Sequence, residues 1–471
     1  MIISARAIVL AASIWVLNGC GGGDCANCNP LSYSIGASVN GLAGSRLALS
    51  NNGLTVAIAP GTTGKVAALF SGLANGASYE VTVATQPTNP SQSCVVTNGK
   101  GTIATSNVEI SVSCISTPAR FLLAQNKSGA AQLCVTVAAI DSDSGVLTTV
   151  AAPPLCGPVR TDQGGILGAP LGPMAADPQG KFLSMAIPGG QIGYVVRFAI
   201  DQASGAVSLI QWVTGAEVGP VAPDPSGKFL FSTSSGLGGG SGGVGTYKID
   251  PASGALTSSG GLNINDGQPY GVSVDPLGRF VYVVYSQLAS NQNLVIPLPF
   301  DPLSGALARV AAPIAVDGGD WVVADPSGKF LYVGNDASKN ISAFKVDPTT
   351  GALTSVAGAP FTITGAGQND SLTAAIDLSG NYLYVASYVG SNISAYAIDR
   401  STGQLAPING SPFPTGPTPN FIVVEPLGRF VYVSGNSGVS AFRIDSANGA
   451  LAAVSGSPFA LAFGGRISLS Y

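Results

Sequence analysis

Short apolar runs separated by turn-forming residues recur through most of the chain, and residues 321–356 show the pattern most clearly. Phe330–Val333 and Ile341–Val346 are rich in aromatic and β-branched residues, which favour buried strands. The sequence DPSG precedes the first run and DPTTG follows the second, and Pro and Gly at such places are typical of tight turns. With Trp321–Ala324 before the first turn and a run beginning at Leu353 after the second, the pattern predicts four short strands.

Both turn patterns recur at intervals of about 50 residues, which identifies an internal repeat. The first pattern begins at Asp177, Asp224, Asp275, Asp325, Asp377 and Glu425. The second, an Asp followed four residues later by a Gly, begins at Asp141, Asp201, Asp250, Asp301, Asp347, Asp399 and Asp445. A unit of four short strands cannot bury both faces of its sheet alone, and a repeat of this length suits one blade of a β-propeller.

The first turn pattern occurs six times and the second seven times, and the ends of the repeat region account for the difference. The repeats begin at Arg120–Leu123, which matches Lys329–Tyr332 without the strand that should precede it. They end at 465–471, a lone strand without its partners. We therefore expect residues 117–471 to form a seven-bladed β-propeller in which strand 465–471 completes the first blade. Closing the ring in this way removes exposed sheet edges.

A separate group of strand-like runs precedes the repeats. The runs are Tyr33–Val39, Arg46–Leu49, Leu54–Ile58, Lys65–Phe70, Tyr79–Thr85, Ser93–Thr97 and Val108–Cys114. Gly, Asn and Pro residues separate them, and the Asn-Gly pairs at 52–53 and 98–99 indicate hairpins or bends. These features predict that residues 31–116 form a small β-sandwich of immunoglobulin or transthyretin type.

Composition agrees with an all-β fold and limits the catalytic, metal-binding and nucleic-acid-binding functions that the chain could have. The chain has 63 Gly, 32 Pro and only 9% charged residues, a balance that favours short strands and turns over helices. The net charge of −4, without a basic stripe, argues against nucleic acid as a partner. The absence of His excludes a Ser-His-Asp triad and removes the commonest zinc ligand. We expect no cofactor and no metal site; aspartates and backbone carbonyls leave calcium open, without EF-hand-like spacing.

The first residues have the pattern of an export signal. Arg6 precedes an apolar run at 7–17 that is too short to cross a bilayer. The sequence Leu-Asn-Gly-Cys that ends at Cys20 resembles a bacterial lipobox, although its Asn replaces a smaller residue. The resemblance implies a signal peptide at 1–19, a lipidated Cys20 and a flexible linker at 20–30, with the remainder tethered outside the cytoplasm. The alternative is an ordinary secretory signal with a cysteine there by chance.

The lipid is expected to be the attachment to the membrane, because no second apolar run reaches transmembrane length. Gly21, directly after the cysteine, would favour sorting to the outer membrane if the organism is Gram-negative. Residues 31–116 also resemble a small module that is common just after the anchor in bacterial surface lipoproteins. That second resemblance implies no chemistry.

Six cysteines follow Cys20, and an even number in an exported chain favours disulfides. Pairing by nearest neighbour gives Cys94–Cys114 and Cys134–Cys156. Cys25 and Cys28 have thioredoxin-like spacing, but they lie in a Gly-rich linker without a strand–helix context. A local Cys25–Cys28 disulfide is therefore expected in preference to a redox site.

The two faces of the predicted propeller differ. Regular tight turns lie on one face, whereas the loops between second and third strands and the crossings between blades lie on the other and vary in length. Irregular loops on a rigid scaffold are where binding sites are usually built. Side chains near the starts of the innermost strands would ring the channel at that face. The candidates are Tyr270, Asp320, Trp321, Asp370, Asn420 and Arg466, with Asp266 and Asp317 slightly outward.

Two kinds of chemistry are open to such a ring. Paired carboxylates could bind a cation or act as general acid and base, and Arg466 could bind a carboxylate or phosphate. The alternative is that these groups are solvated or pair with one another, since large propellers leave a wet channel. Asp141 and its counterparts in the second turn pattern are expected to cap turns instead.

The repeat itself resembles a known family. The sequences DPSGKFLYV, NISAF and VDPTTGAL within 325–353 are similar to the YVTN-type repeat of lactonase-like seven-bladed β-propellers, which include propeller-type 6-phosphogluconolactonases and cycloisomerase-like proteins. The resemblance covers every predicted blade but implies fold more strongly than activity. Lactone-acting members are expected to use His, Arg and Glu near the channel mouth. Tyr270, Asp320 and Asn420 hold places where His is common in the family, so no catalytic residue carries over.

Three functional hypotheses remain. The first is a surface-anchored lipoprotein whose propeller is a binding or scaffold module for an unknown protein, glycan or small molecule. The second is an extracytoplasmic hydrolase that opens a lactone ring with Asp/Glu and Arg side chains at the channel mouth, Asp320 and Arg466 among them. The third is a component of an envelope assembly complex. The absence of His favours binding over catalysis.

Overall fold

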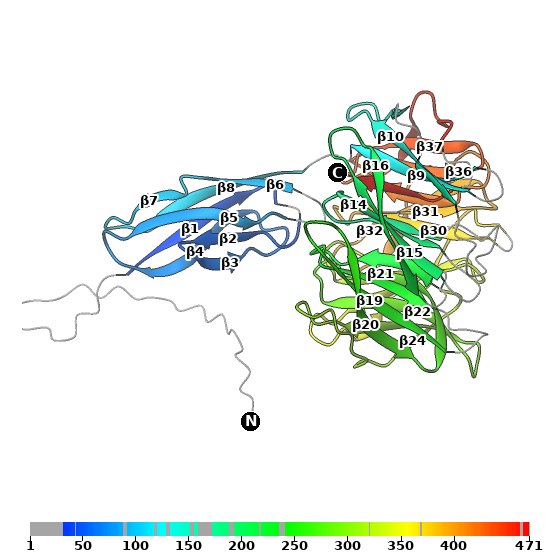
Figure 1. The fold of residues 1–471 in the computed structure, drawn as a ribbon, viewed down its shortest axis with the longest axis horizontal. Coiled ribbons are helices and arrows are strands. Elements are labelled where there is room, and N and C mark those ends of the chain that lie inside the picture. The colour runs from blue at the N-terminus through cyan, green and yellow to red at the C-terminus, as the bar shows by residue number, and fades with distance from the viewer. Residues whose placement is uncertain are drawn as a thin grey trace, which may run out of the picture.

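The computed structural model describes residues 32–42, 44–87, 92–116, 120–128, 132–150, 155–158, 172–187, 193–215, 218–234, 241–319, 321–367, 370–461 and 465–470. The predicted signal peptide 1–19, Cys20, the linker 20–30 and the Cys25–Cys28 pair lie outside the described residues, as does Asp320. The described residues form strands, turns and loops (Figure 1), which confirms the all-β prediction. Among them we find no helix with the length and apolar character needed to span a bilayer.

The N-terminal strands form two four-stranded sheets. Their bounds are β1 (Tyr33–Asn40), β2 (Ala48–Asn51), β3 (Leu54–Ala57), β4 (Gly64–Leu73), β5 (Ser78–Thr85), β6 (Gln92–Thr97), β7 (Lys100–Thr102) and β8 (Val108–Ser116). The sheet orders are β4-β1-β8-β6 and β3-β2-β5-β7, and one apolar core lies between them. Seven strands match predicted runs to within a few residues. The three-residue β7, which follows the Asn98-Gly99 bend, was not predicted.

Local chemistry explains two features of this small sandwich. Asn52 and Gly53 connect β2 to β3 with φ values of 49° and 89°, left-handed conformations that Asn and Gly tolerate best. Cys94 and Cys114 lie directly opposite each other in β6 and β8 and form a disulfide, as predicted.

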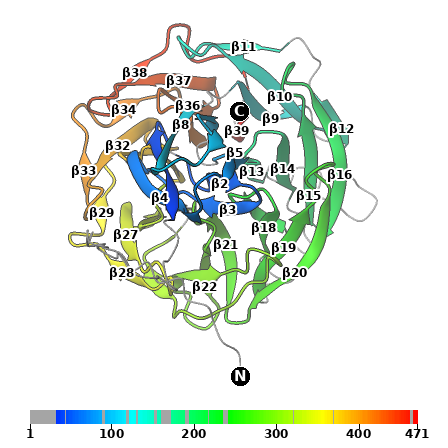
Figure 2. The same cartoon turned by 90° about the vertical axis from the view of Figure 1, so that its left-hand side faces the viewer.

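The rest of the described chain forms seven antiparallel sheets around a central axis (Figure 2), which confirms the seven-bladed prediction. From the axis outward, the strands of each blade are called A, B, C and D. They are β39 (Ile467–Ser470), β9 (Phe121–Ser128), β10 (Gln132–Ile140) and β11 (Leu147–Thr149) in blade 1; β13 (Met174–Ala176), β14 (Phe182–Ile187), β15 (Gly193–Ile200) and β16 (Val207–Gly215) in blade 2; β17 (Val218–Pro223), β18 (Phe229–Ser234), β19 (Gly242–Ile249) and β20 (Leu256–Ile264) in blade 3; β21 (Gly267–Val274), β22 (Phe280–Gln287), β23 (Asn293–Pro299) and β24 (Ile314–Val316) in blade 4; β25 (Trp321–Ala324), β26 (Phe330–Asn335), β27 (Asn340–Val346) and β28 (Leu353–Ser355) in blade 5; β30 (Leu372–Ile376), β31 (Tyr382–Ser387), β32 (Asn392–Ile398) and β33 (Leu405–Pro407) in blade 6; and β35 (Phe421–Val424), β36 (Phe430–Gly435), β37 (Gly438–Ile444) and β38 (Leu451–Ala453) in blade 7.

Three blades carry an additional pairing. The short strands β12 (Leu155–Pro158), β29 (Phe361–Thr362) and β34 (Phe413–Pro414) pair with the C strands of blades 1, 5 and 6. The pairing of β12 places the backbone of Cys156 opposite Cys134, and Cys134 is disulfide-bonded.

Blade 1 joins the two ends of the propeller segment. Strand β39 pairs antiparallel with β9. The backbone N–H groups of Gln125 and Arg120 donate to the carbonyl oxygens of Arg466 and Ser470 at 2.8 and 2.9 Å. The last described strand therefore takes the A position of a blade whose other strands come from the start of the repeats.

Each C–D turn packs against the preceding blade through its glycine. These glycines have positive φ, and a Cβ atom on any of them would lie within 2.7 Å of an aromatic ring at the start of the preceding B strand. The pairs are Gly145–Phe430, Gly205–Phe121, Gly254–Phe182, Gly305–Phe229, Gly351–Phe280, Gly403–Phe330 and Gly449–Tyr382. The Asp that opens each turn caps it: Asp347 Oδ1 accepts the backbone N–H groups of Thr349 and Thr350 at 3.0 and 2.7 Å. The second turn pattern thus serves assembly of the ring.

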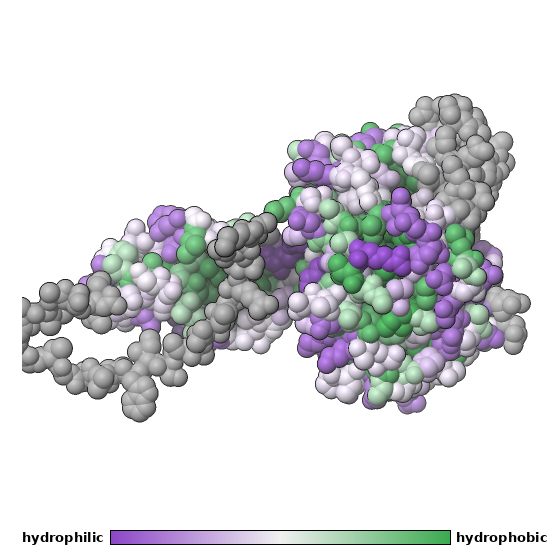
Figure 3. Space-filling model, turned by 90° about the horizontal axis from the view of Figure 1, so that it is seen from below, coloured by the Kyte–Doolittle hydropathy of each residue, from purple (hydrophilic) through white to green (hydrophobic). Residues whose placement is uncertain are grey.

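The sandwich contacts the face of the propeller that carries the A–B turns. Ser45 Oγ donates to the carbonyl oxygen of Pro276 at 3.2 Å, and the Arg46 guanidinium lies 3.9 Å from the Asp224 carboxylate. Asp224 and Pro276 belong to the A–B turns of blades 3 and 4, and the A strands are the innermost strands. In Figure 2 the sandwich accordingly lies in front of the centre of the ring. Polar and apolar residues are interspersed over the side of the propeller seen in Figure 3.

Candidate functional site

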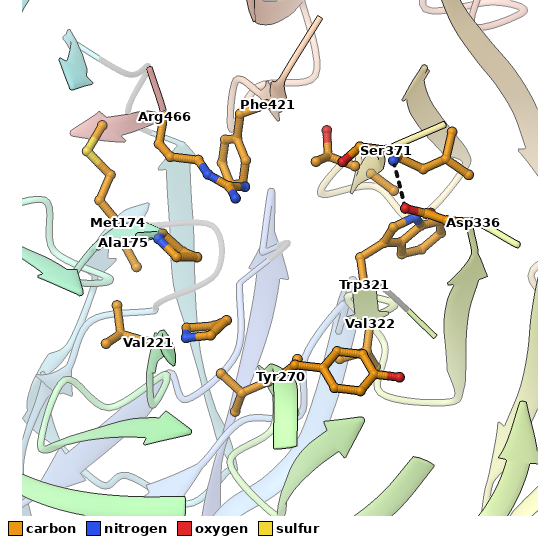
Figure 4. Close-up of a pocket in the computed structure, with 17 residues that line it drawn as sticks. Met174, Ala175, Val221, Tyr270, Trp321, Val322, Asp336, Ser371, Phe421 and Arg466 are labelled. Carbon is orange, nitrogen blue, oxygen red and sulfur yellow. Dashed lines mark hydrogen bonds between the residues drawn. The ribbon is translucent and has the colours of Figure 1, made fainter. Parts of the chain in front are cut away.

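One position of the A strand recurs in all seven blades and lines the same cavity. In blades 2 to 7 it lies four residues before the Asp or Glu of the A–B turn. Blade 1 has no such turn, and there the position is identified by strand pairing. Arg466 lies opposite Gln125 of the B strand, just as Trp321 of blade 5 lies opposite Gly334. The seven residues are Pro173, Pro220, Gly271, Trp321, Thr373, Phe421 and Arg466, and the cavity measures about 450 Å³ (Figure 4). This volume is within the range of small-molecule sites.

The cavity lies toward the end of the channel opposite the sandwich. Its lining comes from the part of each A strand that is remote from the A–B turn, together with Asp336 from the B–C loop that follows β26. The sandwich contacts A–B turns instead. The irregular loops, expected from the sequence to carry binding, therefore belong to the face with the cavity.

Arg466 is the cation among the described residues that line the cavity. Its guanidinium carbon lies 5.1 Å from the centre of the Phe421 ring, and Figure 4 shows the group directed into the cavity beside that ring. Within the described part of the chain it forms no ion pair and no side-chain hydrogen bond. Burial lowers the pKa of Arg466, because removal from water disfavours its charged form. An anionic ligand would supply the missing partner.

Trp321 provides the largest apolar surface of the ring. Its indole lies against Gly334 of the neighbouring B strand, where a Cβ atom would be 1.9 Å from Nε1. The indole N–H is buried, and no described residue accepts its hydrogen bond. The hydroxyl of Thr373, at the same position of blade 6, is likewise buried without a partner among the described residues. Buried polar groups normally find partners in protein, water or ligand.

Asp336 is the carboxylate of the cavity lining. Its Oδ2 accepts the backbone N–H of Leu372 at 3.2 Å, a bond drawn in Figure 4, and this contact ties the B–C loop of blade 5 to the A strand of blade 6. In the same view, Asp336 and Trp321 lie across the cavity from Arg466. The sequence indicated that the loops between second and third strands are variable but did not single out Asp336.

Tyr270 lines the cavity, but its hydroxyl is engaged elsewhere. The oxygen lies 2.8 Å from Asn293 Oδ1 and 2.7 Å from the carbonyl oxygen of Gly318. Figure 4 shows it pointing away from the cavity, so the ring alone forms part of the wall. Tyr270 also lies in the middle of β21 (Gly267–Val274), not at its start as the sequence pattern had suggested.

The structure does not bring the other candidates into this lining. Asp370 is buried, and its carboxylate accepts the backbone N–H groups of Gly367 and Val389 at 2.8 and 2.7 Å and the hydroxyl of Ser387. It thereby holds the B–C loop of blade 6. The backbone N–H of Asn420 donates to Ser434, and Asn420 is absent from the residues that line the cavity.

The two more peripheral carboxylates also lie outside the lining. Asp266 forms a two-bonded ion pair with Arg309, at 2.9 and 3.1 Å, and Asp317 is exposed. Asp320, the remaining candidate, lies outside the described residues. Phe421 was missed by sequence reasoning, although its place four residues before Glu425 matches that of Trp321 before Asp325.

Acid–base and metal chemistry have few candidates in the described structure. The described residues contain no group of three His, Cys, Asp or Glu side chains that could hold a metal ion. Asp336 is the described carboxylate that could activate a water molecule in the cavity, and Arg466 the group that could stabilise negative charge there.

Comparison with known proteins identifies the propeller. Residues 181–299 and 323–460 match the family described as "Lactonase, 7-bladed beta-propeller". A curated 6-phosphogluconolactonase of Pectobacterium carotovorum subsp. carotovorum (strain PC1) is 29% identical over 147 residues, which cover 30% of this chain and 41% of that relative. The match therefore spans less than half the length of that protein.

Solved structures show the same fold at low sequence identity. A putative 6-phosphogluconolactonase from Bacteroides uniformis ATCC 8492 aligns with a TM-score of 0.60 and 15% identity, over 75% of this chain and 99% of that chain. A periplasmic gluconolactonase from Pseudomonas aeruginosa aligns with a TM-score of 0.57 and 17% identity, over 75% and 99% of the two chains. Neither likeness extends beyond the fold.

Proposed function

The chain belongs to the seven-bladed lactonase β-propeller family, and we propose that within this fold it is a binding protein whose channel mouth takes a small anionic ligand. The observation that carries the proposal is Arg466, a partly buried guanidinium in a cavity of about 450 Å³ without an ion-pair partner among the described residues. Charge-assisted hydrogen bonds to such a group are stronger than neutral ones, and guanidinium pairs well with carboxylate or phosphate.

The walls of the cavity suit a ligand with both polar and apolar faces. Trp321, Phe421 and the ring of Tyr270 supply flat apolar surface. Arg466 and Asp336 supply charged groups on opposite walls. Sugar derivatives combine hydroxyl groups with apolar C–H faces and would match this combination.

We also propose that the protein is attached to the bacterial envelope through lipidated Cys20, with the outer membrane as its location in a Gram-negative organism. Membrane attachment through the predicted anchor would leave the ligand site accessible, because the sandwich contacts the propeller face opposite the cavity. The sandwich would then act as a spacer between membrane and propeller. Labelling with a radioactive fatty acid, in wild type and Cys20→Ser, tests the anchor.

A lactone hydrolase is the second candidate function. It is favoured by the position of Asp336, which is held by Leu372 N–H and lies across the cavity from Arg466. Asp336 would act as general base toward water, and Arg466 would stabilise the negative charge that develops on the carbonyl oxygen. The chain has no His to share this work.

Two measurements on the chain without residues 1–20 separate these functions. Calorimetric titration with D-gluconate tests binding, with Arg466→Met expected to weaken it about tenfold or more. Opening of D-glucono-δ-lactone, followed by proton release, tests hydrolysis. Binding that depends on Arg466, without acceleration of ring opening, supports the binding function. Acceleration that Asp336→Asn abolishes supports the hydrolase, and failure of gluconate and of the lactone to engage the protein contradicts both.

A further inference from the structure

We propose that the ligand of the channel mouth is a singly charged sugar acid, such as a uronate or an aldonate, and that the site discriminates against doubly charged sugar phosphates. This inference rests on the proposed binding function and concerns the charge of its ligand. It follows from the balance of charge in the cavity, from the absence of phosphate-binding backbone in the described structure and from the arrangement of the walls.

The described lining offers one cation with which a negative charge of the ligand can pair. Arg466 and Asp336 are the charged side chains among the described lining residues, and they lie on opposite walls. A carboxylate can pair with the guanidinium fork through two hydrogen bonds. A phosphate monoester carries nearly two negative charges at neutral pH, so its second charge would face Asp336 without a second cation. Like charges brought together in a partly desolvated site repel each other strongly.

The described backbone also lacks the elements that usually compensate a phosphate dianion. Phosphates are commonly held at helix N-termini, where several N–H groups converge, and the described residues contain no helix. At the cavity the nearby N–H of Leu372 is already bonded to Asp336. The inner strands carry most of the cavity wall, and their backbone groups are used in ladders with the B strands.

The uncharged part of the wall favours a sugar ring over a simple carboxylic acid. Phe421 lies beside the guanidinium, and Trp321 lies across the cavity from it. A pyranose whose carboxylate bonds Arg466 would present its C–H faces to these aromatic rings. Its hydroxyl groups would lie toward the wall that carries Asp336. The negative charge of Asp336 thus faces uncharged hydroxyl groups of a monoanion but repels a second negative charge.

Three sugars that share the same pyranose ring form a matched set of probes. They are D-glucuronate, D-glucose 6-phosphate and D-glucose, which differ in the group at C6. Titration of the chain without residues 1–20 at pH 8 should give the tightest binding for glucuronate, by about tenfold over glucose. Glucose 6-phosphate should bind less tightly than glucuronate. Arg466→Met should remove the advantage of glucuronate over glucose, and Asp336→Asn should improve binding of the phosphate more than that of the uronate.

A pH series supplies the sharpest comparison. A phosphate monoester has its second pKa near about 6, so lowering the pH from 8 to 5 removes one charge from glucose 6-phosphate. Glucuronate stays singly charged, since a carboxyl group titrates near about 3.5. The chain has no His, the side chain that ordinarily titrates in this interval. Affinity for the phosphate should therefore rise several-fold on acidification, while affinity for glucuronate stays constant.

The possible results separate this inference from the function on which it rests. Glucose 6-phosphate that binds as tightly as glucuronate at pH 8, in a manner dependent on Arg466, would overturn the inference and leave the binding function standing. Glucuronate binding that Arg466→Met leaves unchanged, or failure of glucuronate, glucose 6-phosphate and D-gluconate alike to bind, would overturn both. Circular dichroism of each variant shows whether its fold is retained, and Arg466→Lys, which keeps the charge, gives an intermediate affinity if the contact is ionic.

Discussion

Arg197 in β15 donates from Nε to the carbonyl oxygen of Gly254 in the C–D turn of the next blade, at 3.1 Å, although its side chain is fully buried. Its Nη1 also donates to Ser184 at 2.6 Å, and its guanidinium lies 4.9 Å from the Phe182 ring centre. Burial lowers the pKa of Arg197 to about 10, because a guanidinium removed from water loses hydration. A buried guanidinium, whose removal from water costs free energy, thus forms a contact between blades.

Other blades make the same contact with a neutral side chain. The hydroxyls of Tyr332, Tyr384 and Tyr432 donate to the carbonyl oxygens of Gly403, Gly449 and Gly145 at 3.0, 2.9 and 3.2 Å. Each of these tyrosines lies opposite an Ala of the C strand. In blade 2 the order of sizes is reversed. The B strand has the small residue, Ser184, and the C strand has the long residue opposite it, Arg197.

This exchange predicts the behaviour of a double variant. Arg197→Ala should destabilise the protein by about 3 kcal/mol, because it leaves a cavity and removes a partner of Gly254 and Ser184. Arg197→Ala combined with Ser184→Tyr restores the pair found in blades 5, 6 and 7 and should recover most of that loss. Equilibrium unfolding in urea measures both. Ser184→Tyr alone should destabilise through overpacking against Arg197; if the double variant is no more stable than Arg197→Ala, the proposed equivalence is wrong.

The C–D turn glycines allow a second test of contacts between blades. Gly403 has φ of 80°, and a Cβ atom there would lie 2.4 Å from the Phe330 ring. Gly403→Ala should therefore cost roughly 1 kcal/mol for the backbone and roughly a further 1–3 kcal/mol for the clash. Gly358 has φ of 86° with its nearest contact at 3.7 Å and is the matched control. Equal losses of unfolding free energy in the two Ala variants would contradict a role for Gly403 in packing between blades.

Much of the propeller was readable from the sequence because its turns repeat. The two turn patterns placed the strands of blade 5 closely; β25 has the predicted bounds Trp321–Ala324, and β28 begins at the predicted Leu353. Turn residues carry this information locally, through Pro and Gly conformations and Asp caps. The additional strands β29 and β34 were not predictable, since two-residue strands have no pattern of their own.

The site was less predictable for a geometric reason. The sequence located the correct end of the innermost strands, but successive side chains of a strand point to opposite sides. Nothing in the repeat tells which alternate set faces the axis. Trp321 and Arg466 share the position that lines the cavity, whereas Asn420 precedes that position by one residue and Asp370 by three. Asp336 belongs to a B–C loop and not to an inner strand. The course of that loop depends on the bond between the Asp336 carboxylate and the backbone N–H of Leu372.

The capping aspartates predict a loss of stability in acid. Bonds from the backbone N–H and hydroxyl of Thr350 lower the pKa of Asp347 below 3.8. A carboxyl whose pKa is lower in the folded state stabilises the fold above its unfolded pKa, and this contribution disappears as the pH falls through the folded pKa. The stability difference between wild type and Asp347→Asn should therefore be largest near pH 5 and shrink toward pH 2.5. Thermal unfolding at these pH values measures it.

Other groups titrate over the same range without obscuring this comparison. Burial raises the pKa of Asp177 and Asp377, but both residues are present in wild type and variant alike, so their effects cancel in the difference. A difference in melting temperature that stays constant from pH 5 to 2.5 would show that the Asp347 carboxylate is not responsible.

Removal of residues 465–471 should open the ring. Strand β9 would lose β39 and expose its backbone edge, including the N–H groups that now donate to Arg466 and Ser470. Exposed edges promote association with other chains. The truncated protein should melt at a lower temperature and elute partly as larger species in size-exclusion chromatography. A truncated protein with unchanged melting temperature and elution would contradict closure by this strand.

The contact between Trp321 and Gly334 links the packing of the ring to its site. Gly334 does not have a positive φ, so an Ala is compatible with its backbone. Its Cβ atom, however, would lie 1.9 Å from Nε1 of Trp321, and the indole must move. Because the indole faces the cavity on its other side, Gly334→Ala should shift it into the channel, weaken glucuronate binding about tenfold and cost roughly 1–3 kcal/mol of stability. Tryptophan fluorescence of the chain without residues 1–20 in a Trp212→Phe background, which leaves Trp321 as its tryptophan, measures the movement together with urea unfolding. Trp321→Ala combined with Gly334→Ala removes the clash and should be more stable than Gly334→Ala alone; an unchanged emission spectrum in the single variant would show that the indole does not occupy this position.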